Sequence, residues 1–293
     1  TEPPATEPPA TAPPTTPPVT TEPPATEPPA TEPPGTAPPT TPPATTEPPA
    51  TTEPPLVDVK VYLLRGERLA IAHREVAGPA VLRGALTELL AGPTGDEAAN
   101  ELFTVIPDGT SLLDVSLAEG LATVDLSGEY EQGGGSLSML ARIGQVVFTA
   151  TQFDNVDAVQ FWMDGEPIDF LGGEGIVLDE PQARINVPRE LTGGILFDLP
   201  EPGATVTSLF TVTGEGDVFE GDFPLEIRRD GAKIGDTLIV RAGAWGNWDD
   251  FSIAVTVDAG PGPIEVVGYD GGGCGPPECP LPSEVVLPLV LAE

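Results

Sequence analysis

The first 55 residues are built almost entirely from Thr, Pro, Ala and Glu, in the recurring unit Thr-Glu-Pro-Pro-Ala. This tract holds 22 of the 38 prolines, contains no aromatic residue and has a single branched aliphatic side chain, Val19. Such a stretch cannot bury enough apolar surface to offset the entropy of ordering it. Its Pro-Pro pairs favour polyproline II, which extends by roughly 3.1 Å per residue. We therefore predict a disordered Thr/Pro/Glu stalk over 1–55; the alternative is a low-complexity tail with no spacer role.

The formal net charge of −34 divides as −7 on 1–55, −14 on 56–186 and −13 on 187–293. Because every part is acidic, nucleic acid and anionic membranes are poor partners for this chain. Its apolar runs are also shorter than a membrane span. The sequence starts at Thr1, which predicts a processed or trimmed chain. Membrane contact is expected only through an anchor that preceded Thr1, and whether there was one is left open.

The chain has two cysteines, Cys274 and Cys279, in the Gly/Pro-rich segment 271–282. Two thiols do not complete a zinc site, and the single histidine, His73, is distant in sequence. A local disulfide is the better interpretation, and it implies an oxidising compartment outside the cytoplasm. Because the ring that it closes is short, its stabilisation should lie near the low end of the usual ~2–4 kcal/mol.

The segment after the tract begins with strands and a helix. Apolar and polar side chains alternate over 57–63, which is strand periodicity, and Gly66 allows a turn into a short returning strand near 69–71. Apolar side chains then recur at helical spacing, as expected for a helix with one buried face. We predict that this helix begins at Pro79, since proline suits the first helical turn, and ends at Gly92.

A hairpin, a second helix and a last strand follow. The alternating stretches around 111–117 and 121–126 predict two strands joined by a tight turn. Ser136 is the expected N-cap of a helix that ends near Phe153. Apolar alternation over 156–163 then predicts the last main strand of this region.

The element order β-α-β-β-α-β predicts a small α+β sandwich with two helices laid on one sheet. Truncation of a core leucine in this domain to alanine should cost ~2–5 kcal/mol. The expected core residues are Leu82, Leu86, Leu89, Val124, Leu140, Ile143, Val147 and Phe161.

Several motifs occur in order along this first region. They are REVAGPAVLRGALTELLAGPT at 74–94, IPDGT at 106–110, ATVDLS at 122–127, GGGS at 133–136, the spaced residues Gln145, Thr149 and Gln152, and VQFWMDGEP at 159–167. The set resembles a GerMN domain, which is named from spore germination and sporulation proteins and is also found in actinobacterial envelope lipoproteins. The resemblance covers about 57–180. It implies a fold similar to the ring-building domains of sporulation channel proteins, a role in envelope assembly and no established catalytic residues.

The second region, 190–293, has a periodicity of two with frequent turn residues. Seven short strands in about 100 residues are typical of an immunoglobulin-like β-sandwich. The predicted strands are 195–199, 206–213, 222–229, 237–241, 251–257, 264–269 and 284–291.

The opening P-x-P-G-A-x-V-x-S pattern at 200–208, with the runs 211–227 and 245–257, resembles the immunoglobulin-like domain of bacterial spore germination proteins. That domain commonly follows GerMN, so the order along the chain supports both resemblances. This chain departs from the pattern in its Cys-bearing insert between strands 264–269 and 284–291, which we expect to pair antiparallel. The insert is expected to leave the fold intact.

Residues that could serve catalysis are few. His73 has no recognisable Ser or Asp partners, and we interpret it as a surface or packing residue. Asp96-Glu97 and Asp249-Asp250 resemble glycosidase carboxylate pairs, but such pairs arise freely in a chain with 46 acidic residues. We therefore predict no catalytic residue, no metal site and no cofactor.

Trp245 and Trp248 flank Gly246-Asn247 in a predicted loop before strand 251–257. Exposed indole rings beside amides and carboxylates are a candidate ligand platform, because the apolar face of a sugar stacks on indole. The alternative is that both rings pack over one end of the sandwich, and we favour packing.

These observations predict three parts: the stalk at 1–55, a GerMN-like domain at 56–186 and an immunoglobulin-like domain at 187–293. The expected function is a non-enzymatic, extracytoplasmic envelope protein that serves as a binding or assembly module for an unidentified envelope protein. A carbohydrate- or peptidoglycan-binding protein that holds cell-wall glycan on its sandwich loops is the alternative. An envelope hydrolase has the least support.

Overall fold

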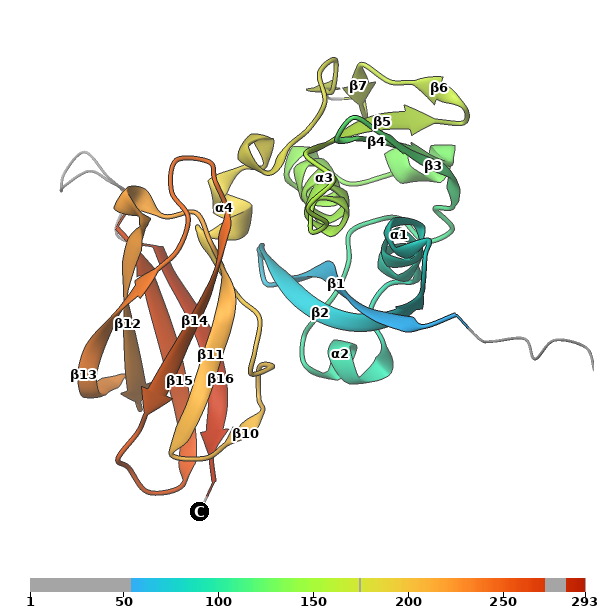
Figure 1. The fold of residues 1–293 in the computed structure, drawn as a ribbon. Coiled ribbons are helices and arrows are strands. Elements are labelled where there is room, and N and C mark those ends of the chain that lie inside the picture. The colour runs from blue at the N-terminus through green and yellow to red at the C-terminus, as the bar shows by residue number, and fades with distance from the viewer. Residues whose placement is uncertain (1–53, 174, 272–282, 293) are drawn as a thin grey trace, which may run out of the picture. The chain divides into compact units, whose positions relative to one another are not determined.

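The computed structural model describes residues 54–173, 175–271 and 283–292 (Figure 1). The predicted stalk lies outside these residues except for Pro54 and Pro55. Cys274 and Cys279 also lie outside them, so the disulfide stays a prediction.

The first domain opens with a long hairpin of strands β1 (Leu56–Arg65) and β2 (Arg68–Ala77). Gly66, at φ 59°, makes the turn, and the register pairs Leu56 with Ala77. The returning strand is therefore much longer than predicted. Residues Val61–Leu64 are all buried, so this part of β1 is covered on both faces.

Side chains of helix α3 (Ser136–Ala150) and of Gln152, just beyond it, take the place of a strand at the free edge of β1. Gln152 accepts from the Lys60 backbone N–H and donates to the Lys60 carbonyl, both at 2.7 Å. Thr149 accepts from the Tyr62 N–H at 3.1 Å, and Gln145 donates to the Tyr62 carbonyl at 3.0 Å. Every second residue of a strand points its backbone N–H and C=O toward the same edge of the sheet. When that edge is buried, these groups need hydrogen-bond partners. This requirement explains the spacing of the Gln-Thr-Gln motif.

The second sheet of this domain has four strands in the order β3-β4-β5-β6. Strands β3 (Leu112–Ala118) and β4 (Leu121–Leu126) form the predicted hairpin. Strand β5 (Ala158–Met163) runs parallel to β4 after the α3 crossover, and β6 (Glu166–Pro167) adds a short edge.

Helices α1 (Val81–Ala91) and α3 pack side by side between the β1–β2 hairpin and the four-stranded sheet (Figure 1). The α+β class is confirmed, but the helices do not lie on one sheet. The physical reason is that every residue from Ala141 to Ala150 is buried. A helix that is buried all round needs packing partners on opposite sides, and here two separate sheets supply them.

Two predicted helix starts are wrong by a residue or two. Helix α1 begins at Val81 with Ala80 at the N-cap, so Pro79 precedes the helix. Gly135, not Ser136, is the N-cap of α3, which ends at Ala150. Six of the eight predicted core residues are buried, and Leu82 and Leu140 are half-buried against the same cluster.

Short elements complete the first domain and connect it to the second. Within the first domain, a small helix α2 (Gly95–Ala99) follows α1, and the 3₁₀ turn η1 (Gly128–Glu131) precedes α3. Strands β7 (Phe170–Leu171) and β8 (Ile176–Val177), turn η2 (Arg184–Asn186) and helix α4 (Arg189–Thr192) then lead into the second domain. Val187, Leu191 and Leu196 belong to the first core cluster, although the predicted boundary assigns them to the second domain. That boundary stays a prediction.

The second domain is the predicted two-sheet sandwich. One sheet has the order β10-β16-β15-β12-β13 and the other β14-β11-β9. Strands β15 and β16 pair antiparallel, as predicted, with Ile264 opposite Leu289. The bounds are β9 Ile195–Phe197, β10 Thr205–Val206, β11 Leu209–Gly216, β12 Asp222–Arg229, β13 Ala232–Arg241, β14 Asp249–Thr256, β15 Gly262–Asp270 and β16 Ser283–Leu291, with the 3₁₀ turn η3 (Phe219–Gly221) between β11 and β12.

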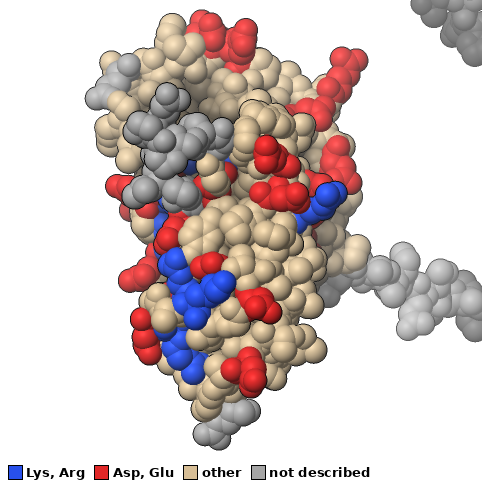
Figure 2. All heavy atoms as spheres, turned by 90° about the vertical axis from the view of Figure 1, so that its left-hand side faces the viewer, with Lys and Arg blue, Asp and Glu red and all other residues tan. Residues whose placement is uncertain are grey.

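Charge is unevenly placed on the surface. Figure 2 shows most of the Lys and Arg side chains of this face along one strip and another apart from it, with Asp and Glu scattered between them. The β12–β13 hairpin carries Arg228, Arg229, Lys233 and Arg241, and its register sets Arg228 opposite Lys233. Arg228 also forms an ion pair with Glu284. In the described part of the chain, no helix is long and apolar enough to cross a membrane.

Candidate functional site

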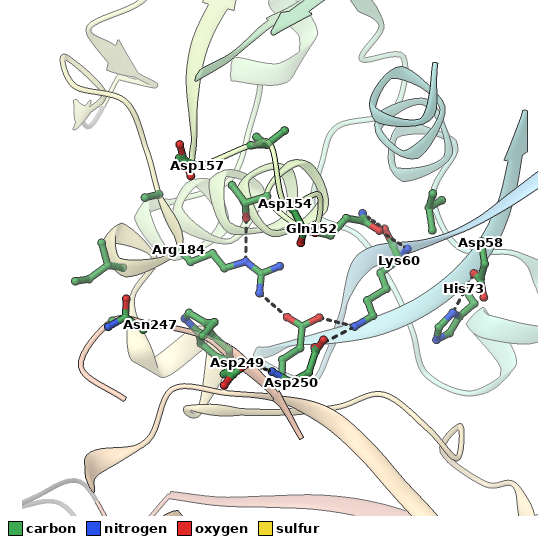
Figure 3. A pocket seen from close by; sticks show the side chains of 18 residues that line it. Asp58, Lys60, His73, Gln152, Asp154, Asp157, Arg184, Asn247, Asp249 and Asp250 are labelled. Carbon is green, nitrogen blue, oxygen red and sulfur yellow. Dashed lines mark hydrogen bonds and ion pairs between the residues drawn. The ribbon is translucent and has the colours of Figure 1, made fainter. Parts of the chain in front are cut away.

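A cavity of about 630 Å³ opens where the two domains meet (Figure 3). The first domain contributes the β1–β2 hairpin, the segment that follows α3 and the turn at Arg184. The second domain contributes Glu215 of β11 and the loop that runs from Gly246 into β14. Elements distant in sequence therefore build one site.

Glu215 lies at the centre of the junction and is only 4% exposed. Its carboxylate accepts hydrogen bonds from Lys60 Nζ at 2.6 Å, from the Tyr62 hydroxyl at 2.6 Å and from Arg184 at 2.5 Å. Burial opposes ionisation, but the charges of Arg184 and Lys60 outweigh it and hold the pKa of Glu215 below its usual value. Burial also raises the pKa of Tyr62 well above its usual value, and Glu215 adds to the rise, so the phenol stays a donor.

Strand geometry and aromatic packing position these donors. Lys60 and Tyr62 are two apart on β1, so their side chains leave the strand on the same face. The Tyr62 ring packs on Phe148 with centroids 5.3 Å apart. Arg184 holds its guanidinium 4.6 Å from the Phe148 centroid and donates from Nε to Thr151 Oγ1 at 2.9 Å. Contacts with Phe148 and Thr151 therefore orient the guanidinium independently of its ion pair with Glu215.

His73 belongs to the same network, and the structure gives it two Asp partners that the sequence pattern does not reveal. Its Nε2 lies 2.6 Å from Asp198 and its Nδ1 lies 3.1 Å from Asp58. The hydrogen bond to Asp198 dominates over burial and raises the pKa of His73 to about 9, so the ring is charged at neutral pH. Lys60, opposite His73 in the hairpin register, lies 3.4 Å from Asp198. A two-residue turn at Gly66-Glu67 would have placed Lys60 opposite His73 from the sequence alone.

The rim of the cavity is acidic. Asp154, Asp157 and Asp249 line it, and among the residues that the structure describes no basic side chain lies within ion-pair distance of any of them. Asp250 lies 3.9 Å from Lys60 and is largely exposed. The cations inside the cavity are paired with Glu215 and Asp198, so they do not neutralise the rim.

The other predicted carboxylate pair, Asp96-Glu97, lies away from the cavity, in α2. Glu97 forms an ion pair with Arg74 and closes a capping box with Thr94. Its role is therefore to hold α2 in place.

The structure places the two tryptophans of the candidate ligand platform in different surroundings. Trp248 lines the cavity and packs edge-on against Phe148, with centroids 5.0 Å apart at 85°. Trp245 is 72% exposed and meets Phe219 edge-on, with centroids 4.8 Å apart. Trp248 thus joins the two domains, whereas Trp245 offers indole surface to solvent. A ligand role for either residue stays a prediction.

The glycine run before α3 serves the helix entry. Buried Arg142 donates to the carbonyls of Gly133 at 2.7 Å, Tyr130 at 2.8 Å and Val105 at 2.8 Å. These bonds tie the loop to the helix that it precedes. In the ranges 54–173, 175–271 and 283–292, no group of three His, Cys, Asp or Glu residues is arranged to hold a metal ion.

Comparison with known families assigns both domains. Residues 60–169 match the family model Germane, described as sporulation and spore germination. Residues 195–272 match Gmad2, described as the immunoglobulin-like domain of bacterial spore germination. The chain carries a GerMN domain followed by a spore-germination immunoglobulin-like domain. The GerMN domain supplies Lys60, Tyr62 and His73 to the junction, and the immunoglobulin-like domain supplies Asp198 and Glu215.

Three solved structures are similar to parts of this chain. The first GerMN domain of the sporulation protein GerM from Bacillus subtilis is 22% identical, with a TM-score of 0.37 over 44% of this chain and 98% of that one. A putative lipoprotein from Clostridium perfringens is 19% identical, with a TM-score of 0.35 over 46% and 91%. The tandem GerMN domains of GerM are 16% identical, with a TM-score of 0.39 over 68% and 61%. Among curated proteins, none matches significantly.

Proposed function

We propose that this protein is a non-enzymatic component of the bacterial cell envelope, in which the two domains act outside the cytoplasm as one binding or assembly module. The observation that carries the proposal is the succession of two domains from spore-germination families. The junction supports their joint action, because Glu215 of one domain is bonded to three side chains of the other part of the chain.

The state of the titratable groups at the junction supports a role without catalysis. A general base must be unprotonated near neutral pH and free to reach its substrate. His73 is protonated there, because its pKa is about 9, and both its ring nitrogens face carboxylates. Glu215 is ionised but is already bonded to three donors. These groups therefore hold the junction together instead of offering a base or an acid to a substrate.

The composition of the chain supports a place outside the cytoplasm. The tract 1–55 suits a spacer that holds the folded domains away from an anchor, since proline-rich chains are extended and semi-rigid. A disulfide between Cys274 and Cys279 would agree with that location, because such bonds persist in oxidising compartments.

Cell fractionation tests this proposal. The protein, expressed from its own gene with a C-terminal tag, should be found in the envelope or medium fraction, and externally added protease should degrade it in intact protoplasts. Retention in the cytoplasm would contradict the proposal. Lysis bands in a peptidoglycan zymogram, lost in a variant of an exposed cavity carboxylate such as Asp249→Asn that still folds, would support the hydrolase alternative instead.

Glycan binding is the second candidate, and the exposure of Trp245 favours it. An indole ring that is 72% exposed beside Asn247 presents both stacking surface and an amide. Sedimentation with purified cell wall tests this function. A Trp245→Ala variant should lose most of the bound fraction, while Phe170→Ala, which removes an exposed aromatic ring outside the cavity, should not. Full sedimentation of Trp245→Ala would remove the glycan platform.

A further inference from the structure

The cavity at the domain junction has the size of a binding site. Its volume of about 630 Å³ lies well within the range of roughly 300–1,000 Å³ that is usual for ligand pockets. A second pocket of about 310 Å³ adjoins it and shares Arg184, Ile185, Gly246 and Trp248 with it. The two pockets therefore form one continuous recess along the junction.

The distribution of charge selects the kind of ligand. Lys60, Arg184 and His73 lie within ion-pair distance of four carboxylates, those of Asp58, Asp198, Glu215 and Asp250, so these three cations are already balanced. The carboxylates that remain lie at the rim, on Asp154, Asp157 and Asp249, and have no cationic partner within the described part of the chain. A recess with walls of low dielectric focuses the field of such charges and attracts cations.

Apolar side chains beside the rim indicate that the cationic group belongs to a larger organic ligand with apolar parts. Ile185 is 65% exposed and lines both pockets, and Trp245 is 72% exposed on the adjoining loop. Trp248 lines the cavity itself, and an indole ring attracts ammonium and guanidinium groups through its face. A bare metal ion is a poorer fit, because the described residues include no three-ligand group.

We propose that this recess receives a Lys or Arg side chain from a basic segment of a partner protein, with apolar side chains of that segment packed against Ile185 and Trp245. The inference rests on the proposed assembly function and adds the chemistry of the partner. A neutral sugar would leave Asp154, Asp157 and Asp249 without a countercharge, so the observations favour the basic segment over a glycan.

Peptide binding tests the inference. The probe is the amidated, acetylated peptide Ala-Leu-Arg-Leu-Ala, and its control replaces the arginine with citrulline, which has the same shape but no charge. Titration of the full chain by NMR or calorimetry at ~0.15 M salt, where exposed charges more than about 8 Å apart are largely screened, reports the two affinities. The arginine peptide should bind about tenfold more tightly than the citrulline peptide, since paired charges govern this contact.

Matched variants locate the binding. Asp154→Asn/Asp157→Asn/Asp249→Asn should lose about tenfold in affinity for the arginine peptide. Glu166→Gln/Asp236→Asn/Asp258→Asn removes the same charge from exposed positions outside the cavity and should stay within about twofold. Equal losses in both variants, equal affinity for the citrulline peptide, no binding by the wild type, or tighter binding of a chitin oligosaccharide would each overturn the inference. Circular dichroism of both variants checks that they fold.

Cell fractionation distinguishes failure of the inference about the basic segment from failure of the proposed envelope function. If the wild-type chain reaches the envelope but its peptide binding does not depend on the rim carboxylates, only the inference about the partner fails. If the wild-type chain stays in the cytoplasm, the envelope function fails whatever the peptide result.

Discussion

Replacing Glu215 with glutamine should lower the free energy of unfolding by about 3–5 kcal/mol, the usual cost of removing one partner from a buried ion pair. The substitution keeps the size of the side chain and one acceptor oxygen but removes the charge that Lys60 and Arg184 share. The Glu215 side chain is 6% exposed, and those of Lys60 and Arg184 are 23% and 14% exposed. Because all three side chains are largely buried, water can replace only part of the lost charge.

The size of the loss follows from what each donor retains. Lys60 keeps Asp198 at 3.4 Å, so it loses only part of its pairing. Arg184 has no other carboxylate within ion-pair distance among the described residues, so it carries most of the cost. The Tyr62 hydroxyl, which is fully buried, competes with both cations for the remaining oxygen. An unsatisfied buried donor costs about 1–3 kcal/mol, and these contributions overlap, so we expect a sum near 3–5 kcal/mol.

Thermal and urea unfolding of the full chain, followed by tryptophan fluorescence and circular dichroism, measures this effect. For a domain pair of this size the loss corresponds to a Tm lower by roughly 6–20 °C. Asp114→Asn is the matched control, because it makes the same carboxylate-to-amide change in a surface ion pair with Arg83, where the two side chains are 70% and 42% exposed. It should cost less than about 1 kcal/mol. A loss for Glu215→Gln no larger than that of the control would refute the reasoning that Glu215 holds the junction together.

Four further experiments have defined outcomes. The pKa of His73 is raised to about 9, so its contribution to stability should be complete below pH ~6.5 and lost as pH rises through about 9. Solvent screening of this half-buried ring reduces the contribution to about 1–3 kcal/mol. Urea titrations at pH 6 and pH 9.5 should show this loss in the wild type and not in His73→Gln. Gln152→Ala leaves two backbone groups of β1 unpaired and should cost about 1–3 kcal/mol by the same assay, whereas a cost near zero would show that water replaces the amide. Leu86→Ala should cost ~2–5 kcal/mol, since this side chain is 1% exposed. Thiol titration of the unreduced protein should find no reactive thiol at Cys274 and Cys279, and two reactive thiols would contradict the predicted disulfide.

The elements whose patterns are local could be predicted from the sequence. Alternation over 57–63 and 121–126 corresponds to β1 and β4, and helical spacing after Pro79 corresponds to α1. Turn residues also predict the β3–β4 hairpin, where Glu119 and Gly120 have φ of 51° and 82°. Such signals depend on neighbours a few residues apart, so they can be read without knowledge of the tertiary structure.

The motifs of the GerMN family can be recognised in the sequence, but the sequence does not reveal what these residues do in the fold. In the sequence, Gln145, Thr149 and Gln152 are only part of a pattern; the structure shows that they bond to the backbone of β1, which lies 83 to 92 residues earlier in the chain. The division of the first domain's strands into two sheets also depends on contacts between residues far apart in sequence, so local patterns do not predict it. Helix α3 has apolar residues on most sides. This pattern alone does not show that two separate sheets pack against opposite sides of the helix.

The sequence by itself determined the domain order, the α+β and immunoglobulin-like classes, and the secondary structure of most of the described chain. Only the tertiary structure brought Glu215 to Lys60 and Tyr62, which are 155 and 153 residues away, and Asp198 to His73, which is 125 residues away. The physical reason is that nothing in the neighbouring sequence distinguishes one carboxylate from the other 45 in this acidic chain. Glu215 and Asp198 differ from the rest because they are buried beside cations, and that burial depends on how the two domains pack.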